Sequence, residues 1–320
     1  MRIKLLTMLL LIASFAVTAG TVTVNFNGLE DLGPDARYEG WIIVNNAPVS
    51  TGIFSVDAGG VPSETSFTVS DADADAAAAF ILTIEPFPDA DPAPASTHIL
   101  AGDINGGSAS VTVGHPAALG DDFTSSTGSF IMAVPSDTGE QGTYANGIWY
   151  LIPPNPDAGL SLPTLPAGWV YEGWVVDTGL GMPISTGTFT AVTGADSDGG
   201  GTTAGPGGTP PFPGQDFINP LRDLTAGHLA VISIEPVPDN SPMPFTMKPL
   251  ASPIVDPGAG GVSQDMANNA AASNPTGQVS INGSGGGGGA TSVPTLGFYG
   301  VLLLILVMFY LSRRHFITNK

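Results

Sequence analysis

Tyr38–Val44 (YEGWIIV) recurs as Tyr171–Asp177 (YEGWVVD), and this repeated stretch decides the fold. Both copies are rich in aromatic and β-branched residues, which is typical of a buried strand. The glycine directly before each tryptophan predicts a bulge or a close approach of two backbones at that point. We therefore expect the same strand, with the same irregularity, at two places in the chain.

Two further blocks recur in the same order. Pro48–Phe54 returns as Pro183–Phe189, and Thr83–Asp89 returns as Ser233–Asp239. The first block suits the second arm of a hairpin, and the second suits a strand that ends at a proline, which cannot donate to a ladder. The second copy is longer because a Gly/Pro-rich insertion at 199–214 separates its last two blocks, and a duplicated fold tolerates growth in a loop. Three ordered blocks found twice predict two copies of one module.

The remaining strand signals lie outside the repeated blocks, at Thr21–Phe26, Ser108–Val113, Gly128–Val134 and Gly147–Leu151. The body shows no apolar 3.6-residue period over twelve residues. We predict an all-β fold of two tandem sandwich-like modules, with an added C-terminal transmembrane helix. A single larger sandwich stays open as an alternative, because the middle strands have no obvious partner.

The predicted organisation has six parts. They are a signal peptide (1–19), a first β module (20–113), connecting β strands (114–160), a second β module (161–255), a Gly-rich linker (256–292) and a sorting signal with a transmembrane helix and basic tail (293–320).

The N-terminus has the pattern of a secretory signal peptide. Two basic residues precede the apolar run Leu5–Val17, and small residues favour cleavage after Ala19. The run is short for a bilayer span, although a retained anchor helix is the alternative. Export would place the body outside the cytoplasm.

A second apolar stretch, Leu296–Leu311, is close to the length of a membrane-spanning helix. Arg313, Arg314 and Lys320 follow it, and basic residues beside a span favour the cytoplasm. We therefore expect the membrane as a partner, with a single-pass C-terminal anchor and the bulk of the chain outside the inner membrane.

The same region resembles an IPTL-type (PEP-CTERM-like) C-terminal sorting signal. The residues that carry the resemblance are Val293, Pro294, Thr295, Leu296, Tyr299, Gly300, Arg313 and Arg314. The resemblance implies a Gram-negative bacterium, an exosortase-like processing enzyme as partner, and release to the surface after a cut near Pro294. An ordinary single-pass anchor is the alternative.

Composition narrows the function. All 28 acidic residues lie between Glu30 and Asp265, where only Arg37, Arg222 and Lys248 are basic. Such a surface repels nucleic acid, because phosphate binding requires Lys and Arg. The chain has no cysteine, which excludes thiolate catalysis, cysteine-based zinc sites and disulfides.

The repeated blocks together resemble the extracytoplasmic C-terminal domain of anti-sigma-K-type factors. That family has a Tyr-x-x-Trp strand, a Pro-Val-Ser-x-Gly-x-Phe turn and a Val-Thr-x-Glu-Pro strand. The resemblance covers Tyr38–Gly102 and Tyr171–Ser252. It implies the fold of that outer domain. Sigma inhibition is not carried over, because only the short basic tail is expected on the cytoplasmic side.

Candidate sites are few. Asp71, Asp73 and Asp75 alternate in a predicted loop and could hold calcium, although a solvated acidic loop is the alternative. Glu85 and Glu235 hold equivalent places in the two copies. They fit a structural contact better than acid–base work, because no nucleophile–base pair accompanies them.

Glu39 and Glu172 are equivalent in the same way, and so are the strand aromatics Trp41 and Trp174. We expect the tryptophans to be core residues rather than a ligand platform. His98, His115 and His228 lack metal-ligand spacing. We therefore predict no catalytic residue and no cofactor except calcium.

Three functions remain. The first is a non-catalytic surface or envelope protein with a polysaccharide or envelope partner. The second is an envelope-sensing regulator of the anti-sigma type that acts through the membrane helix. The third is a carboxylate-dependent polysaccharide hydrolase, which would need two carboxylates in one cleft.

Overall fold

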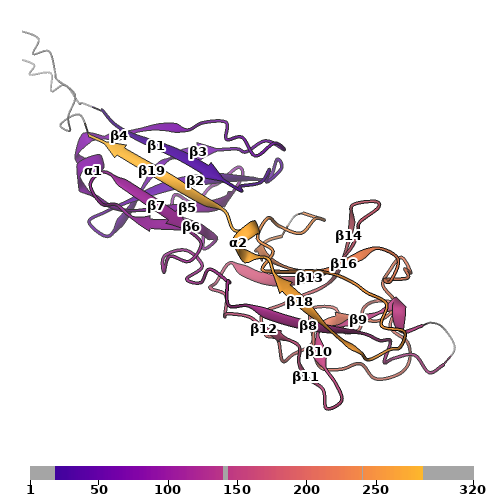
Figure 1. Ribbon diagram of the computed structural model, residues 1–320. Helices are drawn as coiled ribbons and strands as arrows, with labels where there is room; N and C mark the ends of the chain where they lie inside the picture. The colour runs from indigo at the N-terminus through magenta and orange to yellow at the C-terminus, as the bar shows by residue number, and fades with distance from the viewer. Residues whose placement is uncertain (1–18, 140–142, 240, 284–320) are drawn as a thin grey trace, which may run out of the picture. The chain divides into compact units, whose positions relative to one another are not determined.

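The computed structural model describes residues 19–139, 143–239 and 241–283 (Figure 1). The described residues are nearly all β, in two barrel-like antiparallel sheets. Within them, the helical elements are α1 (Asp71–Ala76), α2 (Ala270–Ser273) and one 3₁₀ turn (Tyr144–Asn146). The prediction of an all-β body with two modules is therefore confirmed at the level of the sheets.

We call the first sheet, with α1, module one. Its strand order is β3 (Ala47–Phe54), β2 (Ala36–Val44), β5 (Ala77–Pro86), β6 (His98–Asp103), β7 (Ser108–Thr112), β19 (Thr276–Asn282), β1 (Ala19–Asn27) and β4 (Ser66–Ser70). The sheet curls toward itself. Phe54 of the end strand β3 stacks on Phe26 of β1, with ring centroids 5.8 Å apart, and lies 6.0 Å from Phe67 of the other end strand.

We call the second sheet module two. Its strand order is β14 (Met182–Phe189), β13 (Trp169–Asp177), β16 (His228–Pro236), β17 (Leu250–Pro253), β18 (Ser263–Asn268), β8 (Thr127–Met132), β9 (Ile148–Trp149) and β15 (Gly214–Gln215). Beside these strands, β12 (Leu160–Ser161) pairs with β8, and β10 (Leu151–Ile152) forms a small hairpin with β11 (Asp157–Ala158).

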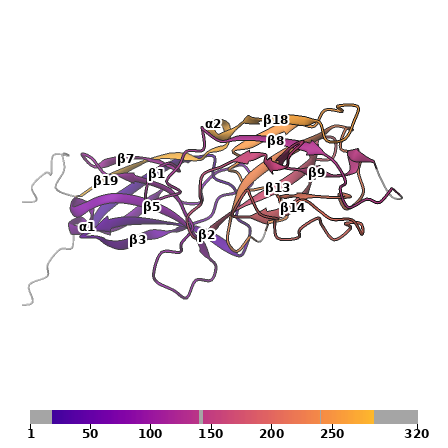
Figure 2. The ribbon, with the colours of Figure 1, turned by 90° about the horizontal axis from the view of Figure 1, so that it is seen from below.

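The two strand orders correspond position by position, but one position is filled differently. In module one it is taken by β19, from the far end of the described chain, which lies between β7 and β1 in both views (Figures 1 and 2). In module two it is taken by β8, which is the strand that follows β7 in sequence. Both strands begin Thr-Gly, and Gly277 lies opposite Val111 as Gly128 lies opposite Met266.

The repeated glycines occupy bulges, as predicted. The β2–β3 register shifts at Gly40, and the β13–β14 register shifts around Gly173. A Cβ atom at either glycine would lie about 2.5 Å from a threonine hydroxyl on the neighbouring strand, 2.5 Å from Thr51 and 2.4 Å from Thr186. This contact is shorter than any side chain tolerates, so the close approach requires glycine.

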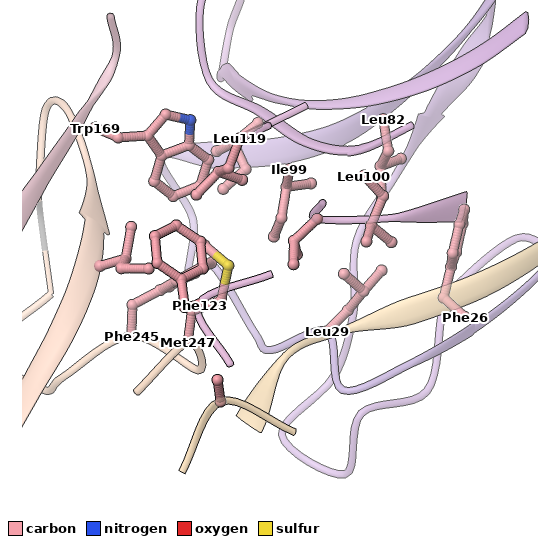
Figure 3. Packing of buried hydrophobic residues seen from close by; sticks show 14 of the residues in the cluster. Phe26, Leu29, Leu82, Ile99, Leu100, Leu119, Phe123, Trp169, Phe245 and Met247 are labelled. Carbon is pink, nitrogen blue, oxygen red and sulfur yellow. The ribbon is translucent and has the colours of Figure 1, made fainter. Parts of the chain in front are cut away.

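One cluster of buried hydrophobic side chains runs through both modules. Figure 3 shows Ile99 of module one on one side of Leu119 and Phe123, with Trp169 and Phe245 of module two on the other. The Trp169 and Phe245 rings lie 6.1 Å apart. Burying one such side chain contributes about 1.5–3 kcal/mol, so this cluster stabilises both modules together.

The predicted boundaries require two corrections. The segment 256–292, expected as a linker, contains β18, α2 and β19. Its alternating stretch Thr276–Asn282 was obscured by the glycines and prolines around it, but long-range pairing with β1 and β7 makes it a strand. The strands expected to connect the modules belong to the second sheet, where β8 and β9 pair with each other.

The predicted terminal segments fall largely outside the described residues. The signal peptide is described only at Ala19, which is exposed at the start of β1. The predicted membrane helix at 296–311 lies wholly outside. In the part of the chain that the structure describes, no helix has the length and apolar character needed to cross a membrane.

Candidate functional site

Module one contains a buried polar network built on three adjacent strands. Trp41 Nε1 donates to Thr83 Oγ1 at 2.9 Å, and the Thr83 hydroxyl donates to the carboxylate of Glu85. The backbone N–H of Ala95 donates to the same Glu85 oxygen at 2.9 Å. Because strand residues two apart point to the same face, the Glu39 side chain lies on the same face of β2 as the Trp41 side chain. The Ser50 hydroxyl of β3 donates to Glu39.

Module two repeats this network. Trp174 Nε1 donates to Ser233 Oγ at 2.7 Å, and the Ser233 hydroxyl donates to Glu235 Oε1. The backbone N–H of Phe245 donates to the same Glu235 oxygen at 2.9 Å. Glu172 accepts from Ser185, as Glu39 accepts from Ser50. Both tryptophans are therefore hydrogen-bonded core residues, 4% and 2% exposed, as predicted.

A third carboxylate completes the arrangement in module two. One oxygen from each of Glu172, Glu235 and Asp239 lies within 4.8 Å of the other two. Glu235 is fully buried and Glu172 is 5% exposed, whereas Asp239 is exposed. Among the described residues, none of the three forms a salt bridge with Lys or Arg. Three carboxyl groups thus meet at the surface end of a buried network.

Burial dominates the electrostatics of these groups. It raises the pKa of Glu235 to about 8, against the hydrogen bonds from Ser233 and Phe245, and Asp239 and Glu172 add to the rise. It likewise raises the pKa of Glu172 to about 7, with Asp239 contributing. In module one burial raises the pKa of Glu39, in part opposed by Ser50.

Two carboxylate oxygens of this three-carboxylate group have no hydrogen-bond partner. Oε1 of Glu172 and Oε1 of Glu235 accept the hydrogen bonds described above, whereas Oε2 of each is buried and unpartnered. A carboxylate only accepts hydrogen bonds, so these oxygens cannot satisfy one another unless a proton or a cation lies between them. The arrangement can therefore hold a cation or share a proton.

A cavity of about 250 Å³ adjoins the module-two carboxylates. It is lined by Glu235 and Asp239 and by the loop 30–36 of module one. Over the equivalent residues of module one lies an open groove of about 550 Å³, lined by Glu39, Trp41 and Asp89. The two networks therefore face different surroundings.

The calcium ligands predicted from the sequence do not belong to this group of three carboxylates. Asp71, Asp73 and Asp75 are on the six-residue helix α1 rather than in a loop. Ser70 caps this helix by accepting from the N–H of Asp73 at 3.1 Å, and its hydroxyl donates to the Asp73 carboxylate at 2.6 Å. Helical geometry turns Asp73 to a different face from Asp71 and Asp75, and the described carboxylates that converge in threes are those of module two.

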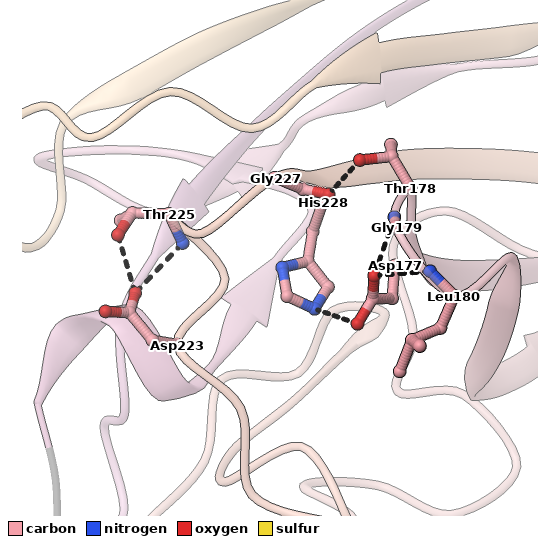
Figure 4. A network of polar contacts seen from close by, with 8 residues as sticks. All are labelled: Asp177, Thr178, Gly179, Leu180, Asp223, Thr225, Gly227 and His228. Atoms are coloured by element: carbon pink, nitrogen blue, oxygen red, sulfur yellow. Dashed lines mark hydrogen bonds and ion pairs between the residues drawn. The ribbon is translucent and has the colours of Figure 1, made fainter.

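The histidines each have a local contact. His228 is buried, with Nε2 3.9 Å from Asp177, and Asp177 accepts from the N–H groups of Gly179 (2.9 Å) and Leu180 (3.0 Å) (Figure 4). The hydrogen bond from Leu180 is the main cause that lowers the pKa of Asp177.

The other two histidines contact residues of module one and the segment after it. His98 Nδ1 lies 2.8 Å from the Ala117 carbonyl, and His115 Nε2 lies 3.5 Å from Asp103. The remaining predicted site residues, Val293 to Gly300 and Arg313–Arg314, lie outside the described part of the chain.

Sequence reasoning found the equivalence of the glutamates but missed their convergence with Asp239. The signal was present, because Asp89 and Asp239 end the third repeated block in both copies. It could not be used, because the separation of Glu172 from the Glu-Pro strand depends on sheet pairing. In the structure, Glu172 lies opposite Ser233, two residues before Glu235.

The comparison with known families agrees with part of this description. The family model of the anti-sigma-K factor RskA C-terminal domain matches residues 10–99. The matched range includes the first copy of all three repeated blocks, so the resemblance of module one to this domain is confirmed. No curated protein and no solved structure matches the chain.

Proposed function

We propose that the protein is an exported, non-catalytic envelope protein that presents its acidic β body outside the inner membrane. The observation that carries this proposal is the pairing of β1 with β19, in which Thr21 lies opposite Asn282. The sequence before β1 has the signal-peptide pattern, and the sequence after β19 leads to the apolar stretch 296–311. Both therefore join the body at the same end of one sheet, which suits a body held to one membrane from one side.

The network geometry supports a structural role for the repeated glutamates. In both copies the carboxylate accepts from a hydroxyl that is itself bonded to a tryptophan, and from a backbone N–H. These bonds fix the start of the loop after the Glu-Pro strand. The partners we propose are the membrane, an exosortase-like processing enzyme and an envelope polysaccharide, with no nucleic acid.

Mass determination of the protein from membrane and surface fractions tests this function. We expect a chain that begins at Gly20 in both fractions. Loss of all residues after about Pro294 in the surface fraction would support sorting, whereas an intact C-terminus in the membrane fraction would indicate plain anchoring. A cytoplasmic protein that retains residues 1–19 would overturn the proposal.

The family match favours a second candidate, an envelope-sensing regulator of the anti-sigma type. Under this alternative, deletion of the gene would raise transcription from promoters that depend on one sigma factor. Re-expression of the chain without residues 312–320 would fail to restore repression. A transcript profile unchanged by the deletion would exclude this candidate and leave the first one intact.

A further inference from the structure

We propose that module two binds one calcium ion through the carboxylates of Glu172, Glu235 and Asp239, and that the equivalent residues of module one do not. The first support is the pair of unpartnered oxygens. Glu172 Oε2 and Glu235 Oε2 are buried without a hydrogen bond, whereas Oε1 of each accepts at least one. An acceptor buried in this way is destabilising unless a proton or a cation satisfies it.

The second support is the local charge. Three carboxylates converge within 4.8 Å, and no described Lys or Arg forms a salt bridge with them. Among the described residues, Lys248 interacts electrostatically with Glu235, and its ammonium donates to the Phe245 carbonyl at 2.6 Å. Repulsion between like charges is strong where water is excluded, and a bound cation removes it.

The spacing and the type of the oxygens suit calcium. Calcium takes six to eight oxygen ligands at about 2.3–2.6 Å, so two ligands on opposite sides of the ion are up to about 5 Å apart. The oxygens of Glu172, Glu235 and Asp239 all lie within 4.8 Å of one another, so one calcium ion can contact all three. Magnesium demands near-ideal octahedral geometry, whereas calcium accepts a flexible one, so calcium is the ion that we propose.

The surroundings supply access and the remaining ligands. Asp239 is exposed, and both Asp239 and Glu235 line the cavity of about 250 Å³. A calcium ion held by three carboxylates requires further oxygens, and water in this cavity can provide them. The buried side of the site is fixed by Ser185 and Ser233, which hold the glutamates in place.

Module one provides the matched control within the same chain. Glu39, Glu85 and Asp89 hold the equivalent positions, but they do not form such a three-carboxylate group among the described residues. The open groove of about 550 Å³ over Glu39 and Asp89 lets water solvate their charges. The difference between the modules is therefore one of convergence, with the three acidic residue types unchanged.

Isothermal titration of calcium chloride into the full chain in detergent tests the proposal. Salt at about 0.15 M screens diffuse binding to the acidic surface. We expect one ion per chain, with a Kd between about 10⁻⁵ and 10⁻³ M. Glu235→Gln and Asp239→Asn should each weaken binding at least about tenfold, because each removes one anionic ligand. Glu85→Gln and Asp75→Asn should leave the affinity within about twofold of the parent, because neither residue belongs to the three-carboxylate group.

Terbium luminescence, excited through tryptophan, gives an independent readout. Terbium binds oxygen ligands as calcium does, so its emission should fall in Glu235→Gln and persist in Glu85→Gln. Far-UV circular dichroism checks the fold of each variant, and the exposed position of Asp239 keeps the test valid if Glu235→Gln unfolds. Equal losses in Glu235→Gln and Glu85→Gln, unchanged affinity in Asp239→Asn, or no saturable binding would each overturn the proposal.

Discussion

Modules one and two share a strand order and a tryptophan–hydroxyl–glutamate network, but they differ in how the sheet is completed and in how the carboxylates are enclosed. Module two is built from one continuous stretch of chain, whereas module one depends on β19 from the far end. Glu172 and Glu235 converge with Asp239, whereas Glu39 and Asp89 of module one face an open groove. The comparison shows that duplicated residues acquire different chemistry when the surrounding loops change how their side chains converge.

The strongest way to break the comparison is to disturb β19. Val279→Asp places a charge at a position that is 1% exposed, which we expect to cost about 4 kcal/mol of unfolding free energy. Hydrogen exchange should show loss of protection in β1 and β7 before β13 and β16. Phe130→Asp, on the equivalent strand β8, should reverse this order.

The matched control for β19 is Ser280→Asp, which adds a charge on the exposed face of the same strand. It should change stability by less than about 0.5 kcal/mol. If Val279→Asp removes protection equally from both modules, the modules unfold as one unit. The different strands that complete their sheets then make no difference to their stability.

Glu30 adds a pH dependence in module one to those of the two glutamates of module two. Burial raises the pKa of Glu30 from 4.5 to about 7, opposed by Lys248 and a backbone bond from Thr246, with Asp239 and Asp31 adding to the rise. Module two has Pro163 at this place.

The direction in which stability changes with pH follows from how many protons Glu30 binds in the folded and unfolded states. Below the unfolded pKa, Glu30 is protonated in both states and costs nothing. Between about pH 4.5 and 7 the folded state keeps its proton while the unfolded state loses it, so stability falls as pH rises, by at most about 3 kcal/mol. Urea unfolding on either side of this window should show the fall, and Glu30→Gln should reduce it to the part that Glu172 and Glu235 contribute in the same direction. A fall of the same size in the variant would contradict this assignment.

The shared network predicts equal effects in the two modules. Trp41→Phe and Trp174→Phe each remove an indole donor to a buried hydroxyl, at 2.9 Å and 2.7 Å. We expect each to lower the unfolding free energy by about 2 kcal/mol, measured by urea unfolding. Values that differ by more than about 1 kcal/mol would show that the two networks are not energetically equivalent.

The smallest effect concerns a contact found in module one alone. The Arg37 guanidinium lies 4.4 Å from the centre of the Phe87 ring, and the equivalent residues of module two are Val170 and Val237. Arg37→Val should cost about 0.5–1 kcal/mol, because a half-exposed cation–π contact contributes about that much. A thermal shift measurement resolves this, and no shift would show that the contact is not stabilising.

The sequence was sufficient for the parts of the fold that are local. The blocks around Trp41 and Trp174 predicted paired strands with a bulge, because aromatic and β-branched residues with a glycine leave few other arrangements. The place of β19 could not be predicted, since Thr276–Asn282 carries no signal for which sheet it joins. Strand pairing over such a separation is decided by the whole chain.

For the candidate site, too, the local features could be predicted from the sequence and the long-range contacts could not. The recurrence of Glu85 and Glu235 indicated a shared role, and the structure shows that role as a hydrogen-bond acceptor for a hydroxyl and a loop N–H. The alternating aspartates suggested a loop, but Ser70 caps a helix there instead. The meeting of Glu172 with Asp239 depends on sheet register and a loop conformation, which residue types alone do not specify.

The path of β19 determines how a mechanical load would travel. Its first residue continues through α2 into module two, and its last leads to the segment after residue 283. A pull between module two and that segment runs along β19, which is held by β1 on one side and β7 on the other. Pulling β19 out requires the hydrogen bonds to both neighbouring strands to break together in shear. The strand therefore gives the body resistance to a pulling force along its length.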